Sequence, residues 1–183
     1  GFYIRHKSLD KLTELCIPYL VKQGLIELIL KTEQYPPACG GAMISQDYIT
    51  DNKEKITFNQ LESIVSLYQE RLKKISEISE LTDFFFKDKL DYDKDLLKWK
   101  DMTEEEIKNV IDKLINILSE IKNWNKENIE KSLEAAGNRG RFLWPLRVAL
   151  SGKKASAGPF EIAEISGKEK TLKRLNEAKN KLI

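Results

Sequence analysis

The residue types best suited to binding chemistry gather near the carboxyl end, in the stretch RFLWPLRVALSGKKASAGPFEIAEISGKEK at 141–170. A helix-like run there carries Arg147, ends at Ser-Gly, crosses the small-residue segment KKASAG and restarts at Gly-Pro-Phe-Glu. Residues 139–183 hold eleven basic and four acidic residues, a charge of +7, so the rest of the chain carries −5 and the total is +2. A basic end on an otherwise acidic chain favours a polyanionic partner; the alternative is a solvated, lysine-rich terminal helix.

Residues that could form a self-contained active site are scarce. The glycines of the second half lack the preceding strand and the Lys-Ser/Thr pair of a phosphate-binding loop, and no GxSxG segment occurs. His6 is the sole histidine, and Cys16 and Cys39 are too far apart for a CxxC motif, so neither a catalytic triad nor a zinc site of the usual kind is expected. Abundant carboxylates lie on charged helix faces, where they are solvated. These features predict a binding module.

Composition indicates a helical chain that can bury a core. Of its 183 residues, 41% are hydrophobic and 33% charged, with only nine glycines and five prolines. Two cysteines fit a reducing compartment, as buried thiols or as surface residues. No apolar run of 18 residues and no basic-then-apolar start are present, so we expect neither a membrane span nor a signal peptide.

The first half predicts helices separated by one loop. Residues 8–23 are expected to form a helix with Ser8 as its N-cap, bent or broken at Pro18. The apolar stripe of this helix would comprise Leu9, Leu12, Leu15 and Cys16. The segment TEQYPPACGGAM at 32–43 predicts a surface loop. A capping box of Thr57 and Gln60 begins a long helix, and the aromatic cluster at 84–86 is expected to pack at the subdomain junction.

The charged stretch KDKLDYDKD at 87–95 predicts a boundary near residue 92, which gives two helical subdomains, 1–92 and 93–183. Thr103 and Glu106 form a second capping box, for a helix that extends to about Trp124. Further helices are expected at 125–136, 142–150, 159–166 and 168–183, bounded by glycines and begun in one case by Pro159. No strand alternation persists, so the predicted fold is all-α, with roughly eight helices in two packed groups.

Several segments, taken in order, resemble bacterial-type glutamyl-tRNA synthetases. WPLRVALSG at 144–152 resembles their PLR-x-A-L-T/S-G segment, GPFE at 158–161 resembles a helix start, and the GKE and RL of 167–175 resemble the end of those enzymes. Upstream, LYQER at 67–71 resembles the segment that carries an anticodon-reading arginine, TDFFF at 82–86 resembles S-D-F-F-F, and GFYIR at 1–5 resembles the element after the catalytic body. Their order and spacing together are specific.

This resemblance implies a helix cage that binds the anticodon of tRNA(Glu). Single-stranded bases are read by unstacking them and contacting their faces and edges. A loop of small residues lets the backbone approach a base, and a helix N-terminus beyond it offers free N–H groups to acceptors. The implied anticodon contacts are Arg71, Arg147, Ser156, Gly158, Pro159 and Phe160. The implied contacts to the tRNA backbone are Lys153 and Lys154.

Two departures from the family pattern matter. The HIGH- and KMSKS-type signatures are missing, so the resemblance implies a fragment without ligase activity and without a cofactor or metal of its own; ATP and Mg²⁺ would act in the missing catalytic domain of an ATP-dependent glutamate–tRNA ligase. Ser156-Ala157 also stands where the family often has Thr-Pro. The implied partner is tRNA(Glu), with no DNA and no membrane, and the implied protein is a cytoplasmic monomer.

Alternative interpretations stay open at this point. Arg147 could be a structural arginine paired with a helix carboxylate, and Arg71 could belong to a solvated charged face. Trp144 and Phe142 are expected in the core rather than as stacking platforms. The parent could be a non-discriminating enzyme that also charges tRNA(Gln). From another class, the chain could be a helical protein-interaction module with an incidental basic tail.

Overall fold

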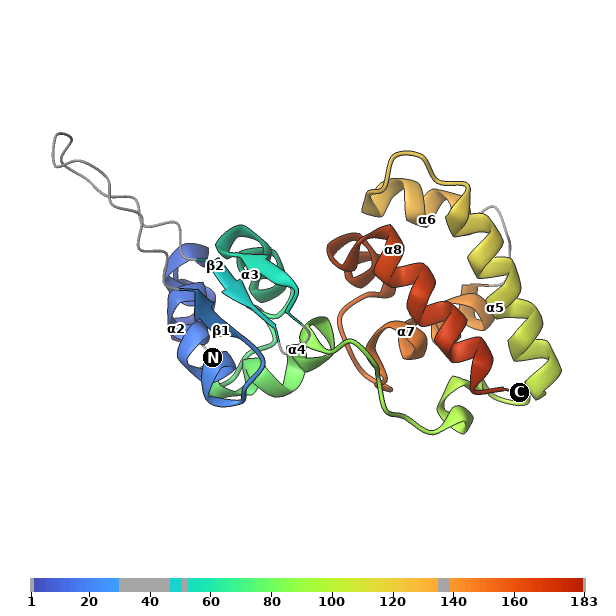
Figure 1. Cartoon of the computed structure of the whole chain (residues 1–183), viewed down its shortest axis with the longest axis horizontal. Helices are drawn as coiled ribbons and strands as arrows, with labels where there is room; N and C mark the ends of the chain where they lie inside the picture. The colour runs from blue at the N-terminus through green and yellow to red at the C-terminus, as the bar shows by residue number, and fades with distance from the viewer. Residues whose placement is uncertain (1, 30–46, 51–52, 135–138, 183) are drawn as a thin grey trace, which may run out of the picture. The chain divides into compact units, whose positions relative to one another are not determined.

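The computed structural model describes residues 2–29, 47–50, 53–134 and 139–182, which fall into two compact units, Gly1–Asp88 and Lys89–Ile183. The division lies at the start of the charged stretch, slightly before residue 92. Helices dominate both units (Figure 1), so the predicted helical fold class is confirmed. Cys39 and Gly137 lie outside the described residues. Each unit is described by itself below.

The first unit combines short and medium helices with a small sheet. Its elements are α1 (Phe2–Arg5), α2 (Leu9–Lys22), β1 (Glu27–Ile29), β2 (Asp47–Ile49), β3 (Lys55–Thr57), α3 (Phe58–Ser66), the 3-10 turn η1 (Ile75–Glu77) and α4 (Ile78–Phe86). The strands pair antiparallel in the order β1–β2–β3, with Leu28 opposite Tyr48 and Tyr48 opposite Ile56. The sequence did not predict this sheet, because three-residue strands are too short to show alternation.

Pro18 does not break helix α2, which continues to Lys22. Pro18 is exposed, while Leu12, Cys16 and Leu20 are buried at four-residue spacing, and α2 packs against α3 and α4. This packing outweighs the backbone hydrogen bond that proline cannot make. The predicted stripe was wrong at Leu15, which is exposed. Of the two alternatives for the cysteines, Cys16 is a buried thiol, and this burial raises its pKa to about 12.

The capping box of α3 is confirmed. The Thr57 N–H donates to Gln60 Oε1 at 2.8 Å, and the Gln60 N–H donates to Thr57 Oγ1 at 3.3 Å. The helix is shorter than predicted and ends at Ser66, since the later apolar residues Tyr68 and Leu72 are buried from the following turn instead. The phenylalanines at 84–86 are buried and form the end of α4.

The second unit packs one long helix against the others. Its elements are η2 (Lys94–Leu97), α5 (Glu104–Ser119), α6 (Lys126–Glu134), α7 (Arg139–Ser151) and α8 (Pro159–Asn180). Helix α8 lies along α5 and α7 (Figure 1). The Thr103–Glu106 capping box is confirmed. Gly167 interrupts α8 with a positive φ of 79°, so the expected stop there is a kink between two helical segments.

Helix α5 ends at Ser119, before the predicted Trp124, and the kink in α8 supplies the reason. The Lys168 ammonium, which follows Gly167, donates to the carbonyls of Ser119 at 2.6 Å and Ile121 at 2.8 Å. A cation at a helix C-terminus satisfies the last carbonyls and the negative end of the helix dipole. One of the lysines of the basic end therefore has a structural task.

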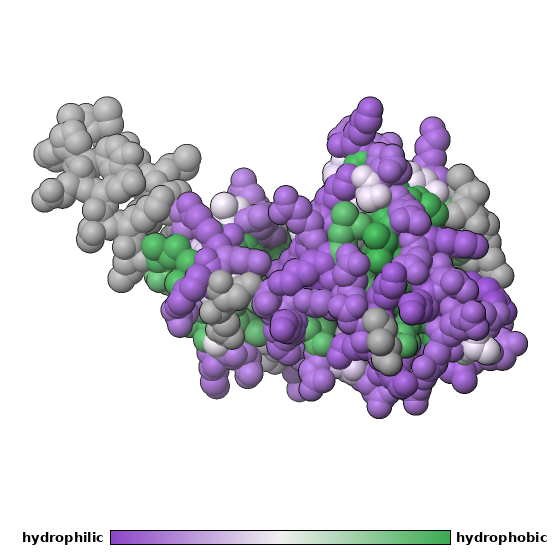
Figure 2. All heavy atoms as spheres, turned by 45° about the vertical axis from the view of Figure 1, so that its right-hand side comes forward, coloured by the Kyte–Doolittle hydropathy of each residue, from purple (hydrophilic) through white to green (hydrophobic). Residues whose placement is uncertain are grey.

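One face of the molecule is mostly polar. On the face drawn in Figure 2, hydrophilic side chains cover most of the molecule and hydrophobic ones form small patches. Within the described ranges, no helix combines the length and the apolar character needed to cross a membrane.

Candidate nucleic-acid interface

The 152–158 loop joins α7 to α8 and begins with a glycine that the geometry requires. Gly152 has a φ of +66°, in the left-handed region, and its N–H donates to the Val148 carbonyl at 2.7 Å to end α7. A Cβ at this position would lie 3.3 Å from Tyr92 Cδ1. Both the conformation and the close approach of Tyr92 therefore select glycine.

The hydroxyl of Ser151 fixes the first turn of the loop. It donates to the Arg147 carbonyl at 2.7 Å and accepts from the Lys153 N–H at 3.2 Å. Ser151 is buried, so these bonds are sheltered from water. The loop consequently leaves α7 in a defined direction.

Arg147 spans from α7 to the far side of the loop. Its Nη1 donates to the Ser156 carbonyl at 3.2 Å, and the Ser156 hydroxyl donates to the Ala157 carbonyl at 3.0 Å. Ser156 is buried and Arg147 is half-buried. The structure thus brings together two of the residues that the resemblance assigned to the anticodon, with Arg147 bracing the loop backbone.

A buried arginine that the sequence analysis gave no role supports the end of α7. Arg174 is 1% exposed, and its Nη1 donates to the Leu150 carbonyl at 2.6 Å. Beside it, burial raises the pKa of the Tyr92 hydroxyl, as does the charge of Glu177, while the Arg174 charge opposes them. Tyr92 in turn packs against Gly152. Only the tertiary fold brings these residues under the loop, and no local pattern could have revealed them.

Helix α8 begins at Pro159 as the sequence predicted, but the charge at its N-terminus differs from the expectation. Pro159 occupies the first turn after Gly158 as N-cap, and Pro159 and Phe160 are both buried. The Glu161 carboxylate folds back over Gly158, since a Cβ built on Gly158 would collide with it. Glu161 Oε1 lies 2.8 Å from Lys126 Nζ. The chain's own carboxylate therefore faces the helix end that the sequence suggested for an incoming acceptor.

Of the large aromatic residues of α7, Phe142 has the core position expected of it and Trp144 is half-buried. Trp144 donates from Nε1 to the Leu96 carbonyl at 2.9 Å, and its ring centroid lies 5.1 Å from that of Trp99. Phe142 is buried. Their faces are used in packing.

The cations of the basic end differ in their surroundings. In the loop, Lys154 and Ala155 are exposed and Lys153 is half-buried. On the flanking helices, Arg141 pairs with Glu106 at 3.0 Å and Lys179 pairs with Asp112 at 2.5 Å. The second unit carries 20 basic and 16 acidic residues, a net charge of +4, so part of the basic excess of 139–183 is balanced inside its own unit.

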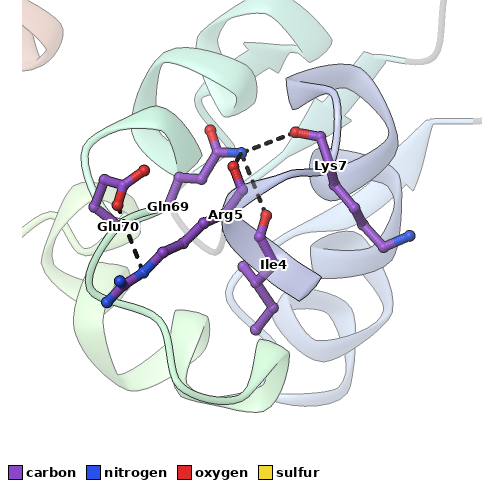
Figure 3. A network of polar contacts seen from close by, with 5 residues as sticks. All are labelled: Ile4, Arg5, Lys7, Gln69 and Glu70. Atoms are coloured by element: carbon purple, nitrogen blue, oxygen red, sulfur yellow. Dashed lines mark hydrogen bonds and ion pairs between the residues drawn. The ribbon is translucent and has the colours of Figure 1, made fainter. Parts of the chain in front are cut away.

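Arg71 belongs to the first unit, at the turn after α3, and is exposed. Its two preceding neighbours hold α1 in place (Figure 3): the Glu70 carboxylate lies 3.5 Å from Arg5 Nε, and the Gln69 amide donates to three backbone carbonyls. These acceptors are Ile4 at 3.4 Å, Arg5 at 3.5 Å and Lys7 at 2.9 Å. The turn that carries the exposed Arg71 is thereby anchored.

The second unit thus carries an arginine-braced loop of small residues that presents lysines between two helices. The chain belongs to the family described as the anticodon binding domain, which it matches over residues 11–179. This match confirms the family resemblance inferred from the sequence.

Individual relatives agree with that assignment. The chain is 35% identical to a glutamate–tRNA ligase of Clostridium tetani, over 100% of the chain and 32% of the relative. It is 29% identical to glutamate–tRNA ligase 2 of Thermoanaerobacter pseudethanolicus, over 97% of the chain and 33% of the relative. Its fold is similar to a crystal structure of a glutamate–tRNA ligase from Elizabethkingia meningosepticum, with a TM-score of 0.69 at 20% identity, covering 99% of this chain and 31% of that one. The chain therefore spans about a third of the length of these relatives.

Proposed function

We propose that this chain is the anticodon-binding part of a glutamate–tRNA ligase and recognises the anticodon of tRNA(Glu). The observation that carries the proposal is the Arg147–Ser156 contact, because it holds a small-residue loop in one conformation within a chain of the anticodon-binding family. A loop held in advance pays less ordering entropy on binding. Glutamate activation with ATP and Mg²⁺ would belong to the parts of such enzymes that this chain does not span. The protein would act in the cytoplasm as a monomer.

In this proposal the two units divide the work. In the second unit (89–183), Arg147 and Ser156, with Gly158, Pro159 and Phe160, shape the surface against which unstacked bases lie, and Lys153 and Lys154 contact phosphates. In the first unit (1–88), Arg71 contacts a further base from its anchored turn. Phosphate contacts position the RNA, and contacts to bases supply the sequence preference.

The first prediction concerns salt. Because about three to five phosphates would be neutralised at single-stranded contacts, the logarithm of the tRNA affinity should fall against the logarithm of salt concentration with a slope of roughly −2 to −4. Fluorescence anisotropy of labelled tRNA(Glu) at several salt concentrations measures it. Replacing exposed Lys154 with alanine should make the slope shallower by about one. A slope near zero would show that the chain does not bind tRNA electrostatically.

The second prediction concerns Arg71. We expect Arg71→Ala to weaken tRNA(Glu) binding by about 1–3 kcal/mol and to relax sequence preference at one anticodon position. The free energy of unfolding should change by less than about 0.5 kcal/mol, since the side chain is exposed. Titration against transcripts varied at each anticodon base tests this, with urea unfolding alongside.

Lys154→Ala is the matched control for Arg71→Ala. It also removes one exposed cation, but it should weaken all transcripts by a similar factor, because a phosphate contact carries no sequence information. If Arg71→Ala behaves in the same uniform way, Arg71 does not read a base.

A further inference from the structure

The carboxylate of Glu161 is held at the end of the 152–158 loop from two sides. Beneath it lies Gly158, whose backbone is extended at φ −60° and ψ 141° and whose missing side chain leaves the room that the carboxylate fills. Beside it, Lys126 Nζ lies 2.8 Å from Glu161 Oε1. The Glu161 side chain is nevertheless 29% exposed. A ligand seated on the end of the loop would therefore meet a fixed and accessible carboxylate.

The support behind Glu161 comes from the start of α6. The Lys126 backbone N–H donates to Glu164 Oε1 at 2.9 Å, and Trp124 Nε1 donates to the Ala163 carbonyl at 3.0 Å. These two bonds fix the start of α6 on the first turns of α8. The Lys126 ammonium is thereby positioned from the backbone outward, and it orients the carboxylate of Glu161.

This arrangement decides which chemical group the loop end favours. A carboxylate three residues after the N-cap complements the positive end of α8, so a phosphate placed there would face negative charge. An ionised carboxylate can only accept hydrogen bonds. It suits the amino group of cytosine or adenine and disfavours a keto oxygen in the same place.

We propose that Glu161 is a specificity-determining residue whose carboxylate accepts a hydrogen bond from the exocyclic amino group of an unstacked base. The inference rests on the proposed function. Cytosine and uracil are the matched pair that tests it, because they differ at this edge in an amino group against a keto oxygen. With the intact chain, cytosine should bind roughly ten- to hundredfold more tightly than uracil at one anticodon position.

The experiment titrates the chain with tRNA(Glu) transcripts that carry cytosine or uracil at each anticodon position in turn. Glu161→Gln keeps a side chain able to cap the helix, as Gln60 does in α3, and removes the charge. We expect its cytosine-to-uracil ratio to fall to within about threefold, because an amide can both donate and accept. Glu169→Gln is the matched control: the same change at an exposed position farther along α8 should leave the ratio as it is in the unchanged chain.

Gly158→Ala gives an independent second variant. The added Cβ would displace the Glu161 carboxylate, so we expect the same loss of the cytosine preference with a melting temperature within a few degrees of the unchanged chain. A cytosine-to-uracil ratio unaltered by Glu161→Gln would overturn the inference. So would an equal change in affinity for all transcripts, which is the result for a purely structural cap.

Failure of this inference can be told apart from failure of the proposed function. If the unchanged chain binds tRNA(Glu) no better than an unrelated polyanion, the proposed function fails and Glu161 has no base to read. If the unchanged chain binds and discriminates anticodons while Glu161→Gln discriminates equally well, only the role of Glu161 is wrong.

Discussion

Replacing Arg174 with alanine should lower the free energy of unfolding of the second unit by about 3–5 kcal/mol, because it opens a cavity and removes a charged hydrogen-bond donor together. The side chain is 1% exposed, and its guanidinium donates to the Leu150 carbonyl at 2.6 Å. Urea unfolding followed by circular dichroism measures the loss. Arg174→Met, which keeps much of the volume without the donor, should cost about 1–3 kcal/mol.

The neighbouring Lys173 provides the control for Arg174. It is exposed on the same helix, and Lys173→Ala should change the free energy of unfolding by no more than about 0.5 kcal/mol. Since Leu150 directly precedes the Ser151–Gly152 turn, the Arg174 variants should also lose tRNA affinity. An Arg174→Ala protein that unfolds within about 1 kcal/mol of the unchanged chain would contradict the role of Arg174 in supporting the loop.

Arg147→Ala should weaken tRNA(Glu) binding by about 1–3 kcal/mol, which is a five- to 150-fold loss. The Ser156 carbonyl would lose its donor at 3.2 Å inside a buried residue, so the free energy of unfolding should also fall by about 1 kcal/mol. The loss of binding free energy should exceed the loss of stability. In the Arg147→Ala protein the loop would no longer be held in its binding conformation, while the helices would remain packed. Hydrogen exchange of the 152–158 amides should speed up.

Arg141→Ala is the matched control for Arg147→Ala, since both arginines lie on α7. Arg141 pairs with Glu106 on the surface, where an ion pair contributes about 0–1 kcal/mol to stability. Arg141→Ala should leave the tRNA affinity unchanged within about threefold. If Arg147→Ala leaves both affinity and loop exchange as they are in the Arg141→Ala protein, Arg147 does not organise the interface.

Local signals predicted the ends of several elements well. The pairs Thr57–Gln60 and Thr103–Glu106 form capping boxes, and Pro159 begins α8, because each of these features depends on residues within one turn. Pro18 predicted a bend or a break in α2, but the helix continues beyond it. The core packing that stabilises this continuation is not visible in the local sequence. The three-stranded sheet was missed because its strands of three residues are too short to show alternation.

The candidate site likewise contains residues that the sequence indicated and residues that only the fold brings together. The residues of the 152–158 loop could be named from the family resemblance, and Gly152 ends α7 as its position after a helical run suggested. The parts that came only with the fold are Arg174, Tyr92 and Lys126, whose side chains reach the loop or the helix ends beside it from other places in the sequence. The Glu161 carboxylate also changes the electrostatics expected of the start of α8.

The most direct measurement is a titration of the unchanged chain with two tRNA(Glu) transcripts that differ only in their three anticodon bases, at one moderate salt concentration. Both transcripts carry the same phosphates, so the sequence-independent attraction is the same for each. If the chain reads the anticodon, the transcript with the replaced anticodon should bind at least about tenfold more weakly, with the loss spread over base contacts of about 1–3 kcal/mol each. Equal affinity for the two transcripts would contradict anticodon recognition by this chain.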